Sequence, residues 1–100
     1  MWMIGTNILN LNKMYKIKLR KEAERVLKKL AKKDKVSSIY ISKKVKQAQE
    51  NPYRFKPLKK PLQGFWRIHI GNYVLIYSID EPNKTIIIER YKPHDEVYKV

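Results

Sequence analysis

The sequence predicts an α+β domain in which an N-terminal strand, an α-helical hairpin and an antiparallel three-strand meander form one unit, with the helices packed on one face of a four-stranded sheet. Three patterns lead to this prediction: an alternating strand pattern that begins at Tyr15, two helical stretches after it, and a strand-rich run from Gly64 to Tyr98. The chain has 100 residues, 43% of them hydrophobic, which is enough for one core. A single domain is therefore expected over residues 14–100.

The first strand is predicted between Tyr15 and Leu19, because apolar residues alternate there with lysines. Residues 1–13 lack such a pattern, and Met14 offers a second possible start. Three interpretations of residues 1–13 stay open: a misassigned start, a disordered tail, or an apolar strap over the core.

A first helix is predicted from about Arg20 to Lys33, because apolar residues recur at the spacing i, i+3, i+4, i+7 and i+8. These residues are Ala23, Val26, Leu27, Leu30 and Ala31. The remaining faces are rich in lysine and arginine, which favours a solvated helix surface over one that follows an RNA.

A second helix is predicted to start at an N-cap among Asp34, Ser37 and Ser38 and to run to about Glu50. It should end there because the residue before Pro52 avoids the helical conformation. A connection of three or four residues would make the two helices an antiparallel hairpin.

The dipeptide Gly71-Asn72 predicts a two-residue hairpin turn, since glycine at the first central position suits a type II′ turn. Pairing outward from this turn sets five pairs: Ile70 with Tyr73, His69 with Val74, Ile68 with Leu75, Arg67 with Ile76 and Trp66 with Tyr77. Directly paired residues share a face. One face is then apolar and should be buried: Trp66, Ile68, Ile70, Tyr73, Leu75 and Tyr77. The other carries Phe65, Arg67, His69, Val74, Ile76 and Ser78.

A third strand of the meander is predicted from Thr85 to Tyr91, after a turn at residues 81–83. Whether Arg90 shares the face of Arg67 and His69 depends on whether the turn has four or five residues, because a shift of one residue moves every side chain to the other face. The sequence leaves both alternatives open.

The segment between Asn51 and Gly64 combines three prolines with basic residues and is predicted to be an extended basic loop. We weigh two roles for it equally, a simple connector and an RNA contact. In the second role the candidate RNA-binding residues are Lys56, Lys59 and Lys60, with Lys92 added where the chain leaves the sheet.

The charge of the chain narrows the classes of partner. It has 23 Lys+Arg against 9 Asp+Glu, a formal charge of +14, so an anionic partner is expected. Cysteine is absent, which excludes disulfides and thiolate metal sites, and two histidines without clustered carboxylates argue against any other metal site. We expect no cofactor and no membrane span, and a cytoplasmic protein.

The meander collects the side chains that RNA cleavage without a metal requires. Arg67 and Arg90 suit a phosphate oxyanion, because guanidinium groups stay charged and match phosphate geometry. His69 or His94 could serve as base or acid near neutral pH, and Tyr98 could stack on a nucleobase. Each of these residues, taken alone, could also be an ordinary solvated or docking side chain. Their occurrence together, in a chain of high positive charge, favours a functional site.

The order of these elements resembles the RelE/ParE superfamily of toxins from toxin-antitoxin systems. The resemblance covers residues 14–98 and is carried by the stretches NPYRFKPLKKPLQGFWRIHIGNYVLIYSID and IIIERYKPHDEVY. The resemblance implies a microbial toxin, closer to the RelE-like than to the ParE-like members. RelE-like members cut messenger RNA in the ribosomal A site and leave a 2′,3′-cyclic phosphate, whereas ParE-like members inhibit DNA gyrase, and superfamily membership alone does not separate the two. The family resemblance also implies as partners a small acidic antitoxin, the ribosome and messenger RNA, and operator DNA through the antitoxin complex alone.

The resemblance also implies roles for individual residues. Arg67 and His69 occupy positions of basic residues that contact RNA, and Arg90 matches an arginine near the end of the last strand. Tyr98 matches a tyrosine that stacks on the substrate base, and His94 stands where many relatives have arginine.

The clearest departure from the family is Val74. Relatives commonly have YRLIY or YRIIY where this chain has YVLIY, and the family arginine supports the scissile phosphate. Loss of such a donor costs roughly 2 to 4 kcal/mol of transition-state stabilisation unless another cation replaces it. Three hypotheses follow: an RNA-cleaving toxin, a ParE-like inhibitor of DNA gyrase, and a degenerate toxin kept as an antitoxin-binding regulatory module.

Overall fold

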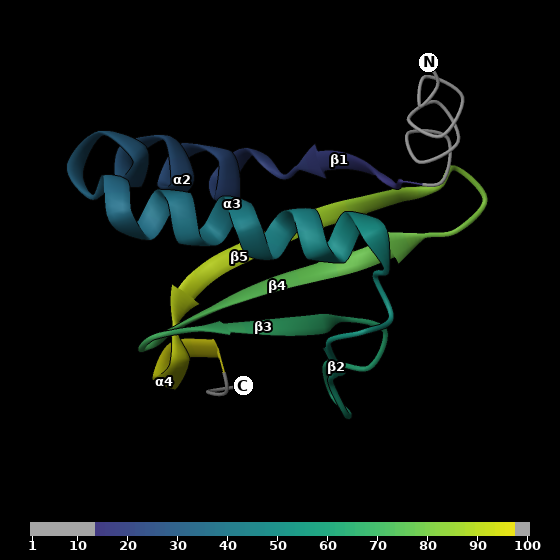
Figure 1. The fold of residues 1–100 in the computed structure, drawn as a ribbon. Coiled ribbons are helices and arrows are strands. Elements are labelled where there is room, and N and C mark those ends of the chain that lie inside the picture. The colour runs from purple at the N-terminus through teal and green to yellow at the C-terminus, as the bar shows by residue number, and fades with distance from the viewer. Residues whose placement is uncertain (1–13, 98–100) are drawn as a thin grey trace, which may run out of the picture.

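The computed structural model describes residues 14–97 as two layers, a pair of helices over one face of a mixed sheet (Figure 1). The strand order is β1-β5-β4-β3-β2, with β1 parallel to β5 and the other neighbours antiparallel. In chain order the elements are β1 (Lys16–Leu19), α2 (Lys21–Lys33), α3 (Lys35–Glu50), β2 (Lys56–Pro57), β3 (Trp66–Ile70), β4 (Tyr73–Asp80), β5 (Thr85–Pro93) and α4 (His94–Val97). The alternatives for residues 1–13, and Tyr98, lie outside the described residues.

The predicted α+β architecture is confirmed, with one strand more than the four expected. The additional strand is β2, which sets Lys56 opposite Arg67 and Pro57 opposite Trp66. Two residues within a proline-rich loop are too few to show a strand period, so the sequence predicted only a loop there. The basic loop is thereby attached to the edge of the sheet.

The two helices have the predicted extents, but the connection between them is shorter than predicted. Asp34 alone joins α2 to α3. Its backbone N–H donates to the Leu30 carbonyl at 2.8 Å, which ends α2. Its carboxylate accepts from the Ser37 N–H at 3.0 Å and from the Ser37 hydroxyl at 2.6 Å, which caps α3. One residue can therefore end one helix and begin the next.

The hairpin around Gly71-Asn72 is confirmed in all five predicted pairs. The apolar side of the hairpin packs under the helices with Ile41, Val45 and Ala48 of α3. Two members of the predicted apolar face are less buried than expected, since Trp66 is half-buried and Tyr73 is exposed.

Burial on the opposite side of β4 was not predicted. Val74 is 0% exposed and Ile76 is 4% exposed, although both point away from α2 and α3. Helix α4 contacts β4 from this side of the sheet (Figure 1). Helix α4 itself was predicted only as a tail, and it lies on the side of the sheet opposite α3 (Figure 1).

The turn between β4 and β5 has four residues, since Asp80 pairs with Thr85. Simple alternation from that pair would set Arg90 opposite Leu75 and turn it into the core. The register shifts between Ile76 and Tyr77, so Glu89 and Arg90 together face Ile76 in a β-bulge. The bulge buries Tyr91 under the helices and turns Arg90 to the other face.

A polar cluster joins three distant segments at the far end of the sheet. The carboxylate of Glu81, in the β4–β5 turn, accepts hydrogen bonds from Tyr15, Tyr53 and Lys84, the Tyr15 distance being 3.0 Å. These contacts lower the pKa of Glu81 to about 2 from its ordinary value of 4.5, the Lys84 contact contributing most. None of the helices within residues 14–97 is long and apolar enough to cross a membrane.

Candidate nucleic-acid interface

The sheet face turned away from α2 and α3, here called the open face, carries a row of cations. Lys56 on β2 pairs with Arg67 on β3, Arg67 pairs with Ile76 on β4, and Ile76 pairs with Arg90 on β5. Directly paired residues lie on one face at about 5 Å spacing, so Lys56, Arg67 and Arg90 form one line across four strands. We call these three residues the cationic row; the sequence had left the face of Arg90 open.

A second line on the open face runs parallel to the cationic row. Its members are His69, Val74 and Lys92, in register across β3, β4 and β5. Lys92 forms an ion pair with Glu22 of α2, with 3.5 Å between Nζ and Oε1. Val74, at the centre, offers no donor. Permanently charged side chains therefore lie closer together in the cationic row than in this second line.

The imidazole rings of His69 and His94 stack on this face, with centroids 5.2 Å apart and planes at 27°. Helix α4 supplies His94, and the His94 N–H donates to the Asn72 carbonyl at 2.9 Å, which ties the helix to the hairpin turn. Burial lowers the pKa of His69 below its ordinary value of 6.5, and the nearby charges of Arg67, His94 and Lys56 lower it further. The surroundings of His69 therefore favour its neutral form.

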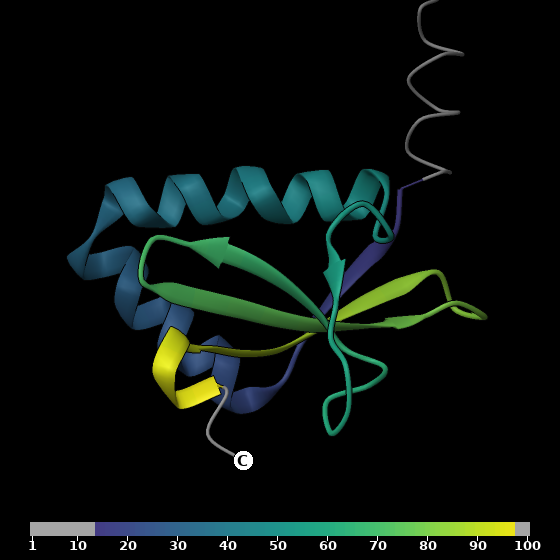
Figure 2. The same cartoon turned by 90° about the horizontal axis from the view of Figure 1, so that it is seen from below.

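The basic loop adds a hollow to one end of the cationic row. A cavity of about 410 Å³ lies between Arg67 and residues 56–62. Lys59 and Lys60, both candidates from the sequence, line it together with two prolines and two leucines. In Figure 2, seen from below, this loop crosses the middle of the view, and α4 lies to the left of it, on the side of the β3–β4 turn. This cavity beside Arg67 could accommodate a phosphate group together with the apolar face of a nucleobase.

The sequence did not predict the hydrogen bonds that join three polar residues at the bulge. The carboxylate of Glu89, whose side chain is 15% exposed, accepts from the Ser78 hydroxyl at 2.7 Å and from Arg20 Nε at 3.0 Å. The Arg20 backbone N–H also donates to the Ile88 carbonyl at 3.0 Å. A β-bulge leaves no periodic pattern in a sequence. The spacing of Ile88 and Tyr91 is the one sign of this bulge in the sequence.

The remaining candidates add little to the geometry. Tyr98 lies outside the described residues, so its predicted stacking role stays a prediction. Within residues 14–97 no group of three His, Cys, Asp or Glu side chains could hold a metal ion. The open face thus joins fixed cations to an imidazole, a set that can bind a phosphodiester and accept a proton from a neighbouring hydroxyl group.

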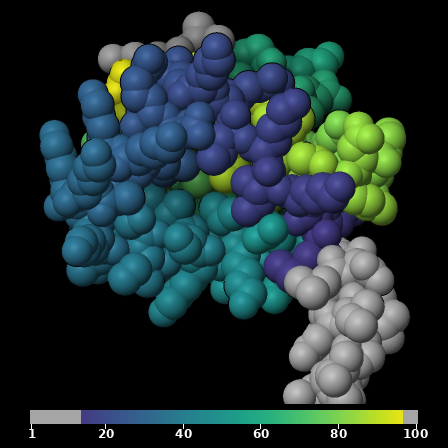
Figure 3. Space-filling model, turned by 90° about the horizontal axis from the view of Figure 1, so that it is seen from above, coloured from purple at the N-terminus to yellow at the C-terminus, as the bar shows by residue number. Residues whose placement is uncertain are grey.

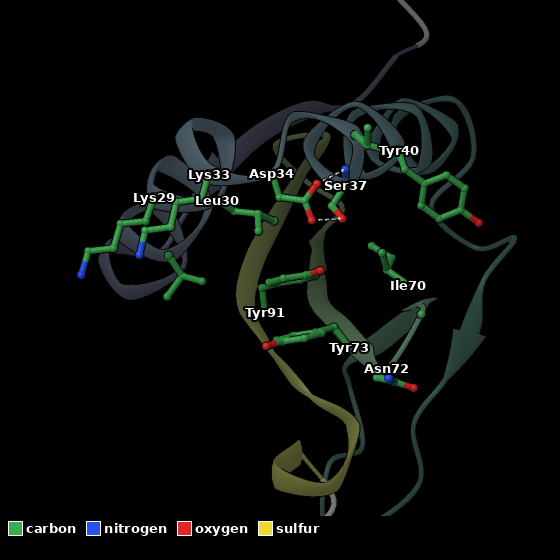
Figure 4. A pocket seen from close by; sticks show the side chains of 13 residues that line it. Lys29, Leu30, Lys33, Asp34, Ser37, Tyr40, Ile70, Asn72, Tyr73 and Tyr91 are labelled. Atoms are coloured by element: carbon green, nitrogen blue, oxygen red, sulfur yellow. Dashed lines mark hydrogen bonds between the residues drawn. The ribbon is translucent and has the colours of Figure 1, made fainter.

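A separate groove of about 650 Å³ lies on the helix side, where the α2–α3 junction meets the β3–β4 turn (Figure 4). Tyr73 and Tyr91 stack against each other there, with centroids 5.0 Å apart. Apolar side chains such as Leu30 and Ile70 form the walls, and Lys29 and Lys33 stand at the rim. This groove is apolar inside and positively charged at its edge.

Comparison with known proteins gives three kinds of match. A family model described as the ParE toxin of the type II toxin-antitoxin system parDE matches residues 17–98. A protein of Methanocaldococcus jannaschii named "Putative toxin RelE4" is 39% identical over 87 residues, which cover 86% of this chain and 93% of that protein.

Solved structures give the same fold. The toxin-antitoxin complex RelBE2 from Mycobacterium tuberculosis contains a chain that matches with a TM-score of 0.68 and 26% identity, over 81% of this chain and 92% of that one. A YoeB/ParE toxin from Agrobacterium tumefaciens matches with a TM-score of 0.72 at 15% identity, over 79% and 98% of the two chains.

Proposed function

The chain belongs to the ParE toxin family of type II toxin-antitoxin systems, within the RelE/ParE superfamily, and we propose that it is a toxin that cuts messenger RNA on the ribosome. The observation that carries this proposal is the cationic row of Lys56, Arg67 and Arg90 beside the stacked His69 and His94. Such a toxin acts in the cytoplasm, where ribosomes translate.

The proposed reaction is attack of a ribose 2′-hydroxyl on the adjacent phosphorus. Neutral His69 accepts the proton of the hydroxyl, and a 2′,3′-cyclic phosphate forms as the bond to the 5′-oxygen breaks. His94 acts as the general acid and donates a proton to that oxygen. The two rings lie side by side at 5.2 Å, a separation that suits the two oxygens that enter and leave a single phosphorus.

The pentavalent phosphorane is held by the cationic row. Arg67 and Arg90 flank Ile76 from neighbouring strands, so both can approach one phosphate. In this arrangement Arg90 and Lys56 replace the donor that Val74 lacks. The lowered pKa of His69 is consistent with this arrangement, because three of its causes are the cations around it.

Translation in vitro followed by primer extension on the message tests this proposal. Purified protein free of antitoxin should produce new message ends only when ribosomes are present. Uncut ribosome-bound message at an excess of protein over ribosomes would rule the cleavage out. Arg67→Ala and Tyr98→Ala should each reduce cleavage while the far-ultraviolet circular dichroism stays unchanged.

Inhibition of DNA gyrase is the second candidate function. The ParE family model and the missing donor at Val74 favour it. A supercoiling assay separates the two: a gyrase inhibitor blocks supercoiling while translation proceeds. A degenerate toxin, the third hypothesis, would bind an antitoxin tightly and show neither activity.

The proposed partner is an antitoxin with an acidic, partly apolar segment, and the complex with it is the proposed route to operator DNA. The groove of Tyr73 and Tyr91 supports this, because its apolar walls suit hydrophobic side chains and the Lys29 and Lys33 rim suits carboxylates (Figure 4). The solved RelBE2 assembly is a toxin-antitoxin complex. A short acidic protein encoded next to this one, bound in a pull-down, is the expected observation.

A further inference from the structure

The outward face of α2 carries a straight line of cations that the proposed cleavage does not use. Lys21, Arg25, Lys28 and Lys32 follow the spacing i, i+4, i+7 and i+11, so they share one stripe. All four side chains are exposed, and the stripe lies opposite the buried side of the helix at Ala23. Over 11 residues the stripe is roughly 16 Å long. We call these four residues the α2 stripe.

Little within the described residues neutralises the α2 stripe. Lys28 forms an ion pair with Glu24 at 3.6 Å, with both side chains largely exposed. Between residues 14 and 97 no carboxylate pairs with Lys21, Arg25 or Lys32. In Figure 3 the α2 segment, in dark blue, forms much of the surface on the helix side, and its side chains project from it. Exposed cations that outnumber their acidic neighbours attract a polyanion.

The chemistry of this surface favours nucleic acid over a protein. A hollow runs along it, and its lining contains four lysines, one arginine, Glu24 and, as the single apolar residue, Ala31. Protein interfaces need an apolar, often aromatic, centre, whereas interfaces with nucleic acid are polar and strongly positive. The groove of Tyr73 and Tyr91 has the first character, and the α2 stripe has the second.

The same lining argues for a double-helical partner. Single-stranded RNA is bound by stacking its bases on aromatic side chains, and no aromatic residue lines this hollow. A rigid, straight row of cations suits instead the regular phosphates of an A-form duplex, which proteins recognise by shape and backbone contacts.

Arg20 connects the α2 stripe to the open face. It precedes the first residue of α2, and its Nε donates to Glu89 at the bulge that positions Arg90. We propose that the α2 stripe is a second RNA-binding surface, which holds the backbone of an RNA double helix independently of whether the open face cuts RNA.

Binding of a fluorescein-labelled RNA hairpin, followed by anisotropy at several salt concentrations, tests the proposal. The variant carries Lys21→Gln, Arg25→Gln and Lys32→Gln, which keep helix propensity nearly constant. Its matched control carries Lys35→Gln, Lys43→Gln and Lys46→Gln, three exposed positions on α3 with the same change in charge. Circular dichroism verifies the fold of both variants.

The α2 variant should lose three phosphate contacts, which lowers the log-log salt slope by about 2.7, at roughly 0.9 per contact. When the salt concentration rises from about 50 to about 200 mM, the affinity of both proteins for the hairpin should fall. The fall should be roughly 40-fold smaller for the α2 variant than for the unmodified protein. The α3 variant should keep the original slope. Equal losses in both variants, or no loss in either, would overturn the proposal.

Three further measurements identify the partner and separate this surface from the open face. If polyglutamate binding depends on the α2 stripe while hairpin binding does not, the partner is an acidic protein and the proposal is wrong. If single-stranded RNA binds as tightly as the hairpin, and its affinity falls by as much in the α2 variant, the assignment of a double-helical partner is wrong. Arg67→Ala and Arg90→Ala should be introduced together into both the unmodified protein and the α2 variant. The difference in hairpin binding between these two proteins should then stay unchanged, whatever the outcome of the cleavage assay.

Discussion

Arg67 and Arg90 lie in one cross-strand row on the same face of the sheet, separated only by a position on β4. Two guanidinium groups that reach one phosphate act as a unit, so their removal should not be additive. This relationship gives the first test of the open face.

Arg67→Ala and Arg90→Ala should each slow cleavage of ribosome-bound message by about 100- to 1,000-fold, because each removes a donor to the transition state. The double variant should lose less than the product of the two. Single-turnover cleavage rates measure this, with Lys43→Ala as the control for loss of one exposed charge. Unchanged rates in both single variants would contradict the site.

Val74→Arg should not increase cleavage, because Arg90 and Lys56 already provide cations in the neighbouring row. Val74 is completely buried, so the larger side chain should lower the free energy of unfolding by about 1 to 3 kcal/mol. Val74→Met, which adds volume without a donor, is the matched control. A gain in rate with arginine and none with methionine would mean that the family donor had not been replaced.

The pH dependence of cleavage should follow His69. Its pKa lies below 6.5, and the neutral ring is the base, so on the acid side of the profile the rate should rise with pH through that lower value. His94→Ala should move the pKa of His69 upward, because it removes a nearby charge and exposes the ring. NMR titration of the His69 ring measures the pKa directly; a downward shift in the variant would be inconsistent with the stacked pair.

Much of the fold could be predicted because it depends on local patterns. Gly71 fixes the turn by its φ of 61°, and all five hairpin pairs follow from that position. The open face was harder to predict. The β-bulge at Glu89 buries Tyr91 rather than Arg90, and the spacing of the apolar residues in β5 gives only an indirect sign of it.

Short elements were missed for a related reason. The strand at Lys56 and the helix at His94 are held by tertiary contacts, pairing with β3 in one case and a hydrogen bond to Asn72 in the other. Neither segment is long enough for propensity to show. The residues of the candidate site were therefore predicted, while the rows that bring them together were not.

Deleting Glu89 should leave Arg90 on the open face. The pairs on either side of the bulge, Tyr77 with Ile88 and Ile76 with Arg90, are consecutive on β4, so the shortened strand becomes regular. NMR contacts between residues 76 and 90 should persist, and the loss of the Arg20 and Ser78 hydrogen bonds should lower the melting temperature. Loss of those contacts in a folded variant would show that the bulge is needed for the register.

Glu81→Gln should lower the melting temperature at neutral pH, because the ionised carboxylate joins Tyr15, Tyr53 and Lys84. The folded protein lowers this pKa to about 2, so the stabilisation is complete above the ordinary value of 4.5 and is lost as pH falls from there toward 2. The difference in melting temperature between the variant and the unmodified protein should shrink over that range. Glu24→Gln, which breaks one exposed pair on α2, should show a smaller effect at neutral pH.

The strand order β1-β5-β4-β3-β2 has a consequence for biosynthesis. The strand that joins β1 to the rest of the sheet is β5, the last one along the described chain. A growing polypeptide therefore lacks both the link between its two halves and Arg90 until residues 85–93 have left the ribosome that makes it. Translation products that stop short of β5 should be unfolded and harmless, so the toxin fold can form only after β5 has been synthesised.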